Sequence, residues 1–367
     1  MEAILAYLRK TYAPHAVIVY GSYADGTQQP DSDFDAVIIT DSDCPSHDAA
    51  VIDGVQLDVW PIRSKAVSGE IDGTEYMHLL GGRILLDERG GATRLLNAAS
   101  EAEAALPWPD REEIKSSLAW CDKMLRRAQR DDAEGMYRTH WLLTDSLSIW
   151  CDVIRERYRG PKKALKMLLH RDPAGYLMYR EALADCAQAQ LGAWIAHLHG
   201  LFDDERRVSF RAATRRDMKR IGQLNVDMHP GDARWTAWRD ASLARYGDGV
   251  SITFVCAVDD MPVGEVTLLL SPACDAIRGR TMLADGARTG NVNALRVSKA
   301  YEGRGFASGL LDVLTQYATA HGLTRLTIGV EAKETRNRAI YQHWGFTEHL
   351  LTEEEDGETV LYYAKEL

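Results

Sequence analysis

A Gly-Ser turn followed by three aspartates constrains this chain more than any other feature of its sequence. The run is Gly21-Ser22, then Asp33-Phe34-Asp35, then Asp58 within Gln56-Leu57-Asp58-Val59-Trp60. Side chains alternate faces along a strand, so Asp33 and Asp35 are predicted to point the same way. Three converging carboxylates repel one another unless a cation lies between them, and hard oxygen ligands suit Mg²⁺. The pattern therefore predicts a magnesium site.

The Gly21-Ser22 turn adds a second signal. Residues 16–20 form a short apolar run that reads as a strand ending at this turn. A helix opening at the turn would offer backbone N–H groups to a phosphate. A metal site beside a phosphate cradle is what nucleotidyl transfer by a two-metal mechanism requires.

This arrangement resembles the nucleotidyltransferase superfamily that includes DNA polymerase β and the antibiotic nucleotidyltransferases. The resemblance implies a polymerase β-like α/β domain over residues 1–106, with ATP as the expected NTP donor. It also implies that Gly21 and Ser22 bind the nucleotide, and that Asp33, Asp35 and Asp58 are catalytic and hold the metal. A general base is expected for the acceptor hydroxyl. Glu75 and Asp145 both stay open as candidates.

The charge of the chain bears on its acceptor. The net charge is −11, and residues 1–60 hold ten Asp or Glu against two Lys or Arg. Tight nucleic-acid binding needs a basic surface, so a nucleic-acid partner is not expected. An acidic cleft would attract a small cationic molecule. The acidity could equally serve only to keep the protein soluble.

The rest of the sequence argues against a membrane, secreted, zinc-binding or disulfide-rich protein. No apolar run approaches the ~20 residues of a membrane span, and no signal peptide is read at the N-terminus. The six cysteines, at 44, 121, 151, 186, 256 and 274, form no Cys-x-x-Cys or Cys/His cluster. Neither a zinc site nor a disulfide framework is indicated. We expect a cytoplasmic protein without a membrane partner.

Residues 107–204 are predicted to form a helical bundle. After Pro107-Trp108-Pro109, Asp110 reads as an N-cap for a helix to Arg130, with a capping-box partner at Glu113. A second helix is expected over residues 133–158, stopped by Gly160-Pro161, with further helices to residue 200. Small-molecule nucleotidyltransferases often carry such a domain.

Two charged segments of this region are the Lys162-Lys163 pair and residues 201–207. Lys162 and Lys163 could reach nucleotide phosphates or could simply form a solvated helix start. Residues 201–207 are charged and read as a linker. A new domain is expected over 205–367.

The C-terminal third has its own strand and turn pattern. Residues 252–258 and 263–270 read as a hairpin around the turn 259–262. A strand over 292–297 leads into Glu302-Gly303-Arg304-Gly305-Phe306-Ala307, and a helix is expected from near Ser308. Glycines between a strand and a helix let backbone amides face a pyrophosphate. A further strand over 323–330 precedes a helix with Asn337 and Tyr341 on one face.

Together these elements resemble the GNAT acyltransferase superfamily, an α/β fold with a central mixed sheet. Glu302 departs from the Gln or Arg expected at the start of that family's turn. The resemblance implies that acetyl-CoA binds along Gly303, Arg304, Gly305, Phe306 and Ala307, that its pantetheine arm pairs with the strand at Leu295 and Val297, and that Asn337 contacts CoA.

The same resemblance supplies candidate chemistry. Tyr341 is expected to protonate the departing thiolate, because a phenol of pKa ~10 matches a thiolate of similar basicity. Glu265 is a candidate base for the acceptor amine, or else a surface carboxylate.

The sequence thus favours a bifunctional enzyme that transfers a nucleotide to a hydroxyl and an acetyl group to an amine. Both families contain enzymes that inactivate aminoglycosides, so an antibiotic acceptor is expected by analogy. Two alternatives stay open: modification of a protein or tRNA, as in toxin–antitoxin pairs, and retention of one domain only as a nucleotide or CoA sensor.

Overall fold

A computed structural model describes residues 1–204, 206–355 and 357–367. The chain divides into two compact units, residues 1–108 and 109–367. Glu205, where the third predicted domain was to start, lies outside the described residues. The predicted division at 1–106, 107–204 and 205–367 stays a prediction, because the second and third of these segments form one unit here.

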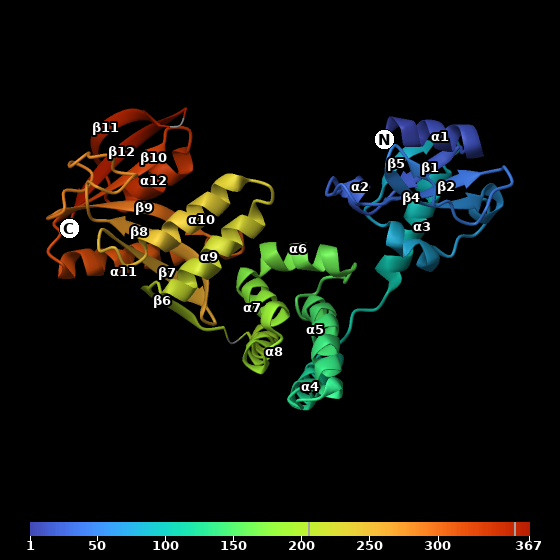
Figure 1. The fold of residues 1–367 in the computed structure, drawn as a ribbon, viewed down its shortest axis with the longest axis horizontal. Coiled ribbons are helices and arrows are strands. Elements are labelled where there is room, and N and C mark those ends of the chain that lie inside the picture. The colour runs from blue at the N-terminus through green and yellow to red at the C-terminus, as the bar shows by residue number, and fades with distance from the viewer. Residues whose placement is uncertain (205, 356) are drawn as a thin grey trace. The chain divides into compact units, whose positions relative to one another are not determined.

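The first unit is a five-stranded sheet with helices on both faces, in the strand order β3-β4-β2-β1-β5. Its elements are α1 (Glu2–Tyr12), β1 (Ala16–Val19), α2 (Ser22–Asp25), β2 (Phe34–Thr40), β3 (Val51–Ile52), β4 (Val55–Arg63), η1 (Ser64–Val67), η2 (Gly73–Leu79), β5 (Arg83–Asp87) and α3 (Gly91–Ala105). Alternation along the strands sends one set of apolar side chains toward α1 and the other toward α3. Figure 1 shows these two helices on either side of the sheet.

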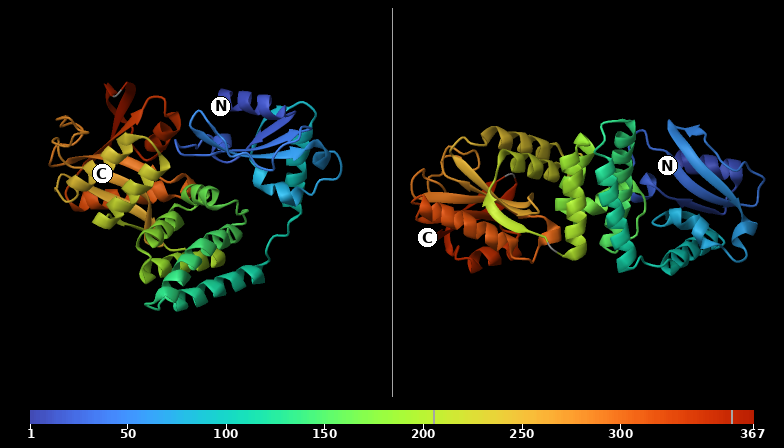
Figure 2. Two further views of the ribbon diagram at one scale, coloured as in Figure 1. Left: turned by 45° about the vertical axis from the view of Figure 1, so that its right-hand side comes forward. Right: turned by 90° about the horizontal axis from the view of Figure 1, so that it is seen from below.

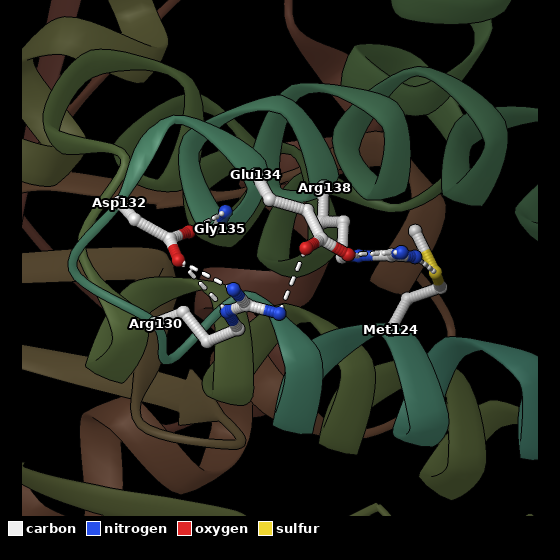
Figure 3. Close-up of polar contacts among 6 residues, drawn as sticks. All are labelled: Met124, Arg130, Asp132, Glu134, Gly135 and Arg138. Carbon is white, nitrogen blue, oxygen red and sulfur yellow. Dashed lines mark hydrogen bonds and ion pairs between the residues drawn. The ribbon is translucent and has the colours of Figure 1, made fainter.

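The second unit begins with five helices: α4 (Arg111–Arg127), α5 (Ala133–Val153), α6 (Pro161–Arg171), α7 (Pro173–Asp185) and α8 (Gln188–Asp203). The predicted capping box at Asp110 and Glu113 is present. Figure 3 shows how α5 starts: Asp132 accepts from the Gly135 N–H at 2.8 Å, and Arg130 bridges Asp132 and Glu134. Side-chain capping by Asp110 and Asp132 therefore fixes where α4 and α5 begin.

Two expectations for this region were wrong. The second helix ends at Val153 rather than near residue 158, because Arg155 takes a left-handed φ of 59°. Gly160-Pro161 does not stop that helix but starts α6, with the proline in its first turn. Lys162 and Lys163 lie exposed in that turn.

The rest of the second unit is a seven-stranded mixed sheet in the order β11-β12-β10-β9-β8-β7-β6. Its elements are β6 (Val208–Ala212), α9 (Arg215–Met228), α10 (Ala233–Arg245), β7 (Ser251–Val258), β8 (Met261–Leu269), β9 (Thr289–Val297), η3 (Lys299–Tyr301), α11 (Phe306–Ala320), β10 (Arg325–Glu331), α12 (Thr335–His343), β11 (Glu348–Glu355) and β12 (Glu358–Glu366). Helices α9 and α10 lie over one face of the sheet and α11 over the other (Figures 1 and 2).

Three boundaries differ from expectation. The linker predicted over 201–207 begins inside α8, which runs to Asp203. The predicted turn 259–262 is shorter, since Asp259 and Asp260 alone connect β7 to β8, both at positive φ. That is the geometry of a two-residue hairpin, which Asp tolerates. The helix expected near Ser308 starts at Phe306.

The helices α4–α8 and the mixed sheet share one hydrophobic core. Buried side chains such as Trp150, Leu177 and Trp194 belong to the same cluster as Val263 and Leu310. Helix α7 packs against β8, and α6 packs against α9 and η3. The helical segment thus contributes to the interior of the sheet-bearing segment.

Candidate functional sites

Two of the predicted metal ligands, Asp35 and Asp58, lie near the start of the pairing between β2 and β4. Asp35 and Asp58 are register partners in this parallel pair, so their side chains leave the same face. Burial and then the charges of Asp58 and Asp35 raise the pKa of Tyr20 to about 12. The phenol therefore lies beside two carboxylates that lie near each other.

Gly21 brings the turn predicted to bind phosphate against this pair. It caps α2 with a φ of 64°, and a Cβ at this position would overlap Asp35 Oδ2. Only glycine allows this approach of backbone to carboxylate. Ser22 is the first residue of α2, a helix of four residues.

Asp33, unlike Asp35 and Asp58, does not lie on a strand. It is exposed and lies just before β2, so the expectation that both members of Asp-x-Asp lie on the strand was wrong. Asp58 Oδ1 receives hydrogen bonds at 2.7 Å from His47 Nε2 and 2.8 Å from Trp60 Nε1. Among the described residues no group of three His, Cys, Asp or Glu side chains is arranged to hold a metal ion. The neighbouring hard-oxygen donors Asp35 and Asp58 fit Mg²⁺.

The two candidate bases for nucleotidyl transfer lie in different units. Glu75 is exposed in η2 of the first unit. Asp145 belongs to α5 of the second unit and accepts a 2.7 Å hydrogen bond from Trp141 Nε1. Both remain predictions.

In the second unit, one cavity of about 700 Å³ collects most of the residues predicted for acetyl transfer. The predicted residues that line it are Glu265, Leu295, Val297, Gly303, Gly305, Phe306, Ala307, Asn337 and Tyr341. The Arg304 side chain instead lies over the ring of Tyr301, 5.4 Å from its centre.

The glycine loop forms one end of this cavity, which we call the donor cavity. Gly303 and Gly305 have φ of 75° and 80°, and a Cβ at either position would meet no atom within 4 Å. Gly305 is the N-cap of α11, and no side chain caps that helix. The first N–H groups of a helix lack intrahelical partners, so this end of α11 can receive an anion.

Strands β9 and β10 stop pairing before β9 reaches the donor cavity. They pair only from Thr289 to Val292 and from Arg325 to Ile328. Beyond that point β9 carries a bulge, where Ala294 has a φ of 50° and the register to β8 shifts. Bulges bend a strand away from its neighbour. The backbone at Leu295 and Val297 is thereby left at the cavity wall.

Glu265 is a buried carboxylate in this cavity. It is 1% exposed, and its Oε1 lies 3.2 Å from Arg296 Nη2 and 3.5 Å from Asn225 Nδ2. Its Oε2 has no hydrogen-bond partner among the described residues. Burial raises the pKa of Glu265, and Arg296 offsets only part of this effect. The alternative of a surface carboxylate was wrong, because α9 covers this face of β8.

Tyr341 lies on α12 with Asn337, one helical turn apart on the same side of the cavity. Its ring stacks on Trp344 at 5.9 Å. Burial and the charge of Glu334 raise the pKa of Tyr341 to about 12. The phenol therefore keeps its proton at neutral pH, and it is a weaker acid than the ordinary phenol assumed in the sequence-based expectation.

Comparison with known proteins agrees with this geometry. The nucleotidyltransferase domain family matches residues 1–74, and the acetyltransferase (GNAT) family matches residues 213–346. The chain joins a nucleotidyltransferase domain to a GNAT acetyltransferase domain. Both domains belong to transferase families, and the fold class expected from the sequence is confirmed.

Individual relatives match only a small part of the chain, or match it at low identity. Mycothiol acetyltransferase of Beutenbergia cavernae is 38% identical over 61 residues, which are 17% of this chain and 20% of that relative. The chain thus spans about a fifth of that protein's length. A spermidine N-acetyltransferase chimera of Vibrio cholerae and human origin is 20% identical, over 43% of this chain and 95% of the other, with a TM-score of 0.34. Arabidopsis thaliana NAA60 with acetyl-CoA is 16% identical, over 44% and 99%, with a TM-score of 0.34.

Sequence reasoning missed two tryptophans of α10 that lie against Arg296 in the GNAT domain, of which Trp235 lines the donor cavity. The Arg296 guanidinium carbon lies 4.3 Å from the ring centre of Trp238 and 5.2 Å from that of Trp235. Arg296 lies opposite Glu265 on the neighbouring strand. The two tryptophans three apart on a helix were the available signal.

In the described part of the chain, no helix is long and apolar enough to cross a membrane. All six cysteines are free.

Proposed function

We propose that the chain is a bifunctional enzyme: a Mg²⁺-dependent nucleotidyltransferase that uses ATP on a small-molecule hydroxyl, and an N-acetyltransferase that uses acetyl-CoA on an amine. The observation that carries the second activity is Glu265 Oε2, a buried carboxylate oxygen with no hydrogen-bond partner in the described part of the chain, in the same cavity as Tyr341 and the glycine loop. Burying a carboxylate oxygen without a hydrogen-bond partner costs free energy. A buried carboxylate with a shifted pKa in a cavity is therefore a candidate for a catalytic role.

The residues of the donor cavity suit each step of acetyl transfer. The pyrophosphate of acetyl-CoA would bind the open end of α11. Glu265 would take a proton from the acceptor ammonium, directly or through water, since its raised pKa makes it a stronger base than an exposed glutamate. The amine nitrogen would then attack the thioester carbonyl carbon, and the C–S bond would break as Tyr341 gives its proton to the sulfur. The surplus proton on the new amide nitrogen would return to the Tyr341 phenolate, directly or through water, and the first proton would stay on Glu265 until solvent removes it.

The first unit supports nucleotidyl transfer through two adjacent groups. Asp35 and Asp58 would hold Mg²⁺, which would supply charge stabilisation at the transferred phosphate. The Gly21-Ser22 turn would hold the nucleotide phosphates beside them.

We further propose a cationic acceptor of the aminoglycoside type, with the enzyme acting in the cytoplasm. The support is the acidic first 60 residues and the pairing of a hydroxyl-modifying family with an amine-modifying family.

The test is intact-mass analysis of polyamines and aminoglycosides incubated with the full chain, Mg²⁺, mixed NTPs and acetyl-CoA. Asp35→Ala and Tyr341→Phe proteins run in parallel. A nucleotide-sized gain lost with the first variant and an acetyl gain lost with the second would establish both activities. Absence of any adduct would reject the small-molecule acceptor, and label appearing on protein bands would favour a protein target.

A further inference from the structure

The second unit holds another cavity, of about 460 Å³, which no step of the proposed reaction uses. Thr253, Thr267, Asn293, Met218 and Trp238 line it. We call it the threonine cavity. The hydroxyls of Thr253 and Thr267 lie 2.8 Å apart, across β7 and β8.

The threonine cavity lies on the same face of the sheet as Glu265. Thr267 follows Glu265 by two residues on β8, and side chains two apart share a face. Thr253, Thr267 and Asn293 are cross-strand partners on β7, β8 and β9, next to the rung formed by Val255, Glu265 and Arg296. Two residues of strand span about 7 Å. A ring-sized molecule could therefore contact Thr267 while its amine lies at Glu265.

Burial along β8 shows that the cavity interrupts the packing. Thr267 is the one residue of β8 that is half-buried rather than buried, although β8 has a neighbouring strand on either side. Helix α10, which supplies Trp238, has no buried residue of its own. The cavity therefore lies where the side chains of Thr253 and Thr267 are incompletely covered.

Trp238 links the two cavities. Its side chain lines the threonine cavity, and its ring lies 4.3 Å from the guanidinium of Arg296, which lines the donor cavity. The charged residues at the rim, Arg245 and Asp275, bind each other at 2.7 Å. The polar groups left to face a ligand are thus neutral hydroxyls and an amide.

We infer that the threonine cavity binds the hydroxylated body of the amine acceptor, so that Thr253, Thr267 and Asn293 determine specificity for polyhydroxylated ring amines. Hydroxyl and amide groups can each donate to and accept from ligand hydroxyls. Trp238 and Met218 supply apolar contacts for the C–H surface of such a ring. This inference rests on the proposed acetyl transfer.

The experiment uses the full chain and two single-ring probes, glucosamine and cyclohexylamine, which share one amine but differ in their hydroxyls. Acetylation rates and glucosamine binding by saturation-transfer NMR are measured for wild type, Thr253→Val/Thr267→Val and a control, Thr319→Val. Valine keeps the shape and the strand preference, so the sheet should persist. Thr319 is exposed on α11 and lines neither cavity.

We expect wild type to prefer glucosamine, and the double variant to raise the KM for glucosamine about tenfold, as lost hydrogen bonds would. The KM for acetyl-CoA, the rate with cyclohexylamine and the control should not change. Equal preference for both probes, or a glucosamine KM unaffected in the double variant, would overturn the inference while leaving acetyl transfer intact.

Loss of glucosamine binding by NMR in the double variant alone would support the cavity assignment even if neither probe were acetylated. In that case the proposed function would fail and the binding site would stand. Unchanged binding in the double variant would reject the site.

Discussion

His197 Nδ1 on α8 lies 3.1 Å from Asp259 Oδ2 in the β7–β8 turn. Its other ring nitrogen lies 2.8 Å from Asp172 Oδ2, at the start of α7. The side chain of His197 is completely buried. One imidazole therefore joins the helical segment to the sheet of the GNAT domain through two carboxylates.

This bridge predicts a pH-dependent stability. Burial alone would lower the pKa of His197, but Asp172 and Asp259 raise it from 6.5 to about 9. A raised pKa stabilises the fold fully below the unfolded-state pKa, and this contribution is lost as pH rises through about 9. Chemical denaturation of wild type between pH 6 and 10 should show the free energy of unfolding falling in that window.

His197→Ala should lower the free energy of unfolding at pH 6 by about 3–5 kcal/mol, because it leaves buried carboxylates unpaired. The matched control is His199→Ala, whose partly exposed pair with Asp122 should contribute less than about 1 kcal/mol. If the two variants lost equal stability, the buried bridge would not have the role given to it here.

Glu265→Gln should reduce acetyl transfer by about a hundredfold or more while leaving acetyl-CoA binding intact, because the amide cannot accept the acceptor's proton. In wild type, the rate should fall with decreasing pH through a pKa above the ordinary glutamate value, since the base must be deprotonated. A pH–rate profile of kcat/KM measures this. An acid limb that persists unchanged in the variant would assign the base elsewhere.

Tyr341→Phe should lower kcat for acetyl transfer by about a hundredfold with little change in the KM for acetyl-CoA. The hydroxyl is lost while the ring that stacks on Trp344 remains. Tyr363→Phe is the control, since Tyr363 lies in β12 and does not line the donor cavity. Steady-state kinetics with varied acetyl-CoA would separate the two terms, and an unaffected kcat would remove Tyr341 from the chemistry.

Gly21→Ala should abolish nucleotidyl transfer and leave acetyl transfer unchanged. The added methyl would overlap Asp35 Oδ2 and push that carboxylate away from Asp58. Gly26→Ala is a matched control: its φ of 76° imposes the same backbone strain, but a Cβ there meets no atom within 4 Å. Paired assays of both activities would decide. Equal losses in the two alanine variants would point to strain rather than to the aspartate.

Much of this architecture could be predicted from residues close together in the sequence. The Asp110 capping box and the Gly303–Gly305 turn signal themselves within a few residues, and both are present. Glu265 could be proposed, but its burial could not, because burial depends on α9 lying across β8. The contacts of Arg296 with Trp238 depend on the β9 bulge, which shifts the register by one residue.

The His197 bridge illustrates the same limit. Its partners lie 25 and 62 residues away along the chain, and a histidine in an apolar helix gives no sign of either. The shortened hairpin turn at Asp259 and Asp260 was within reach, because aspartate is among the residues that accept positive φ.

The shared core of residues 109–367 has a consequence for how this protein can be inherited or engineered. The sequence predicts helices α4–α8 to be a separate domain between two enzymes. Their buried side chains nevertheless belong to the interior of the acetyltransferase domain. A recombination event or a cloning boundary near residue 205 would expose that interior, whereas one at Trp108–Pro109 would not. The parts of this chain that could be exchanged as units are therefore residues 1–108 and residues 109–367, and the acetyltransferase domain has to be kept together with helices α4–α8.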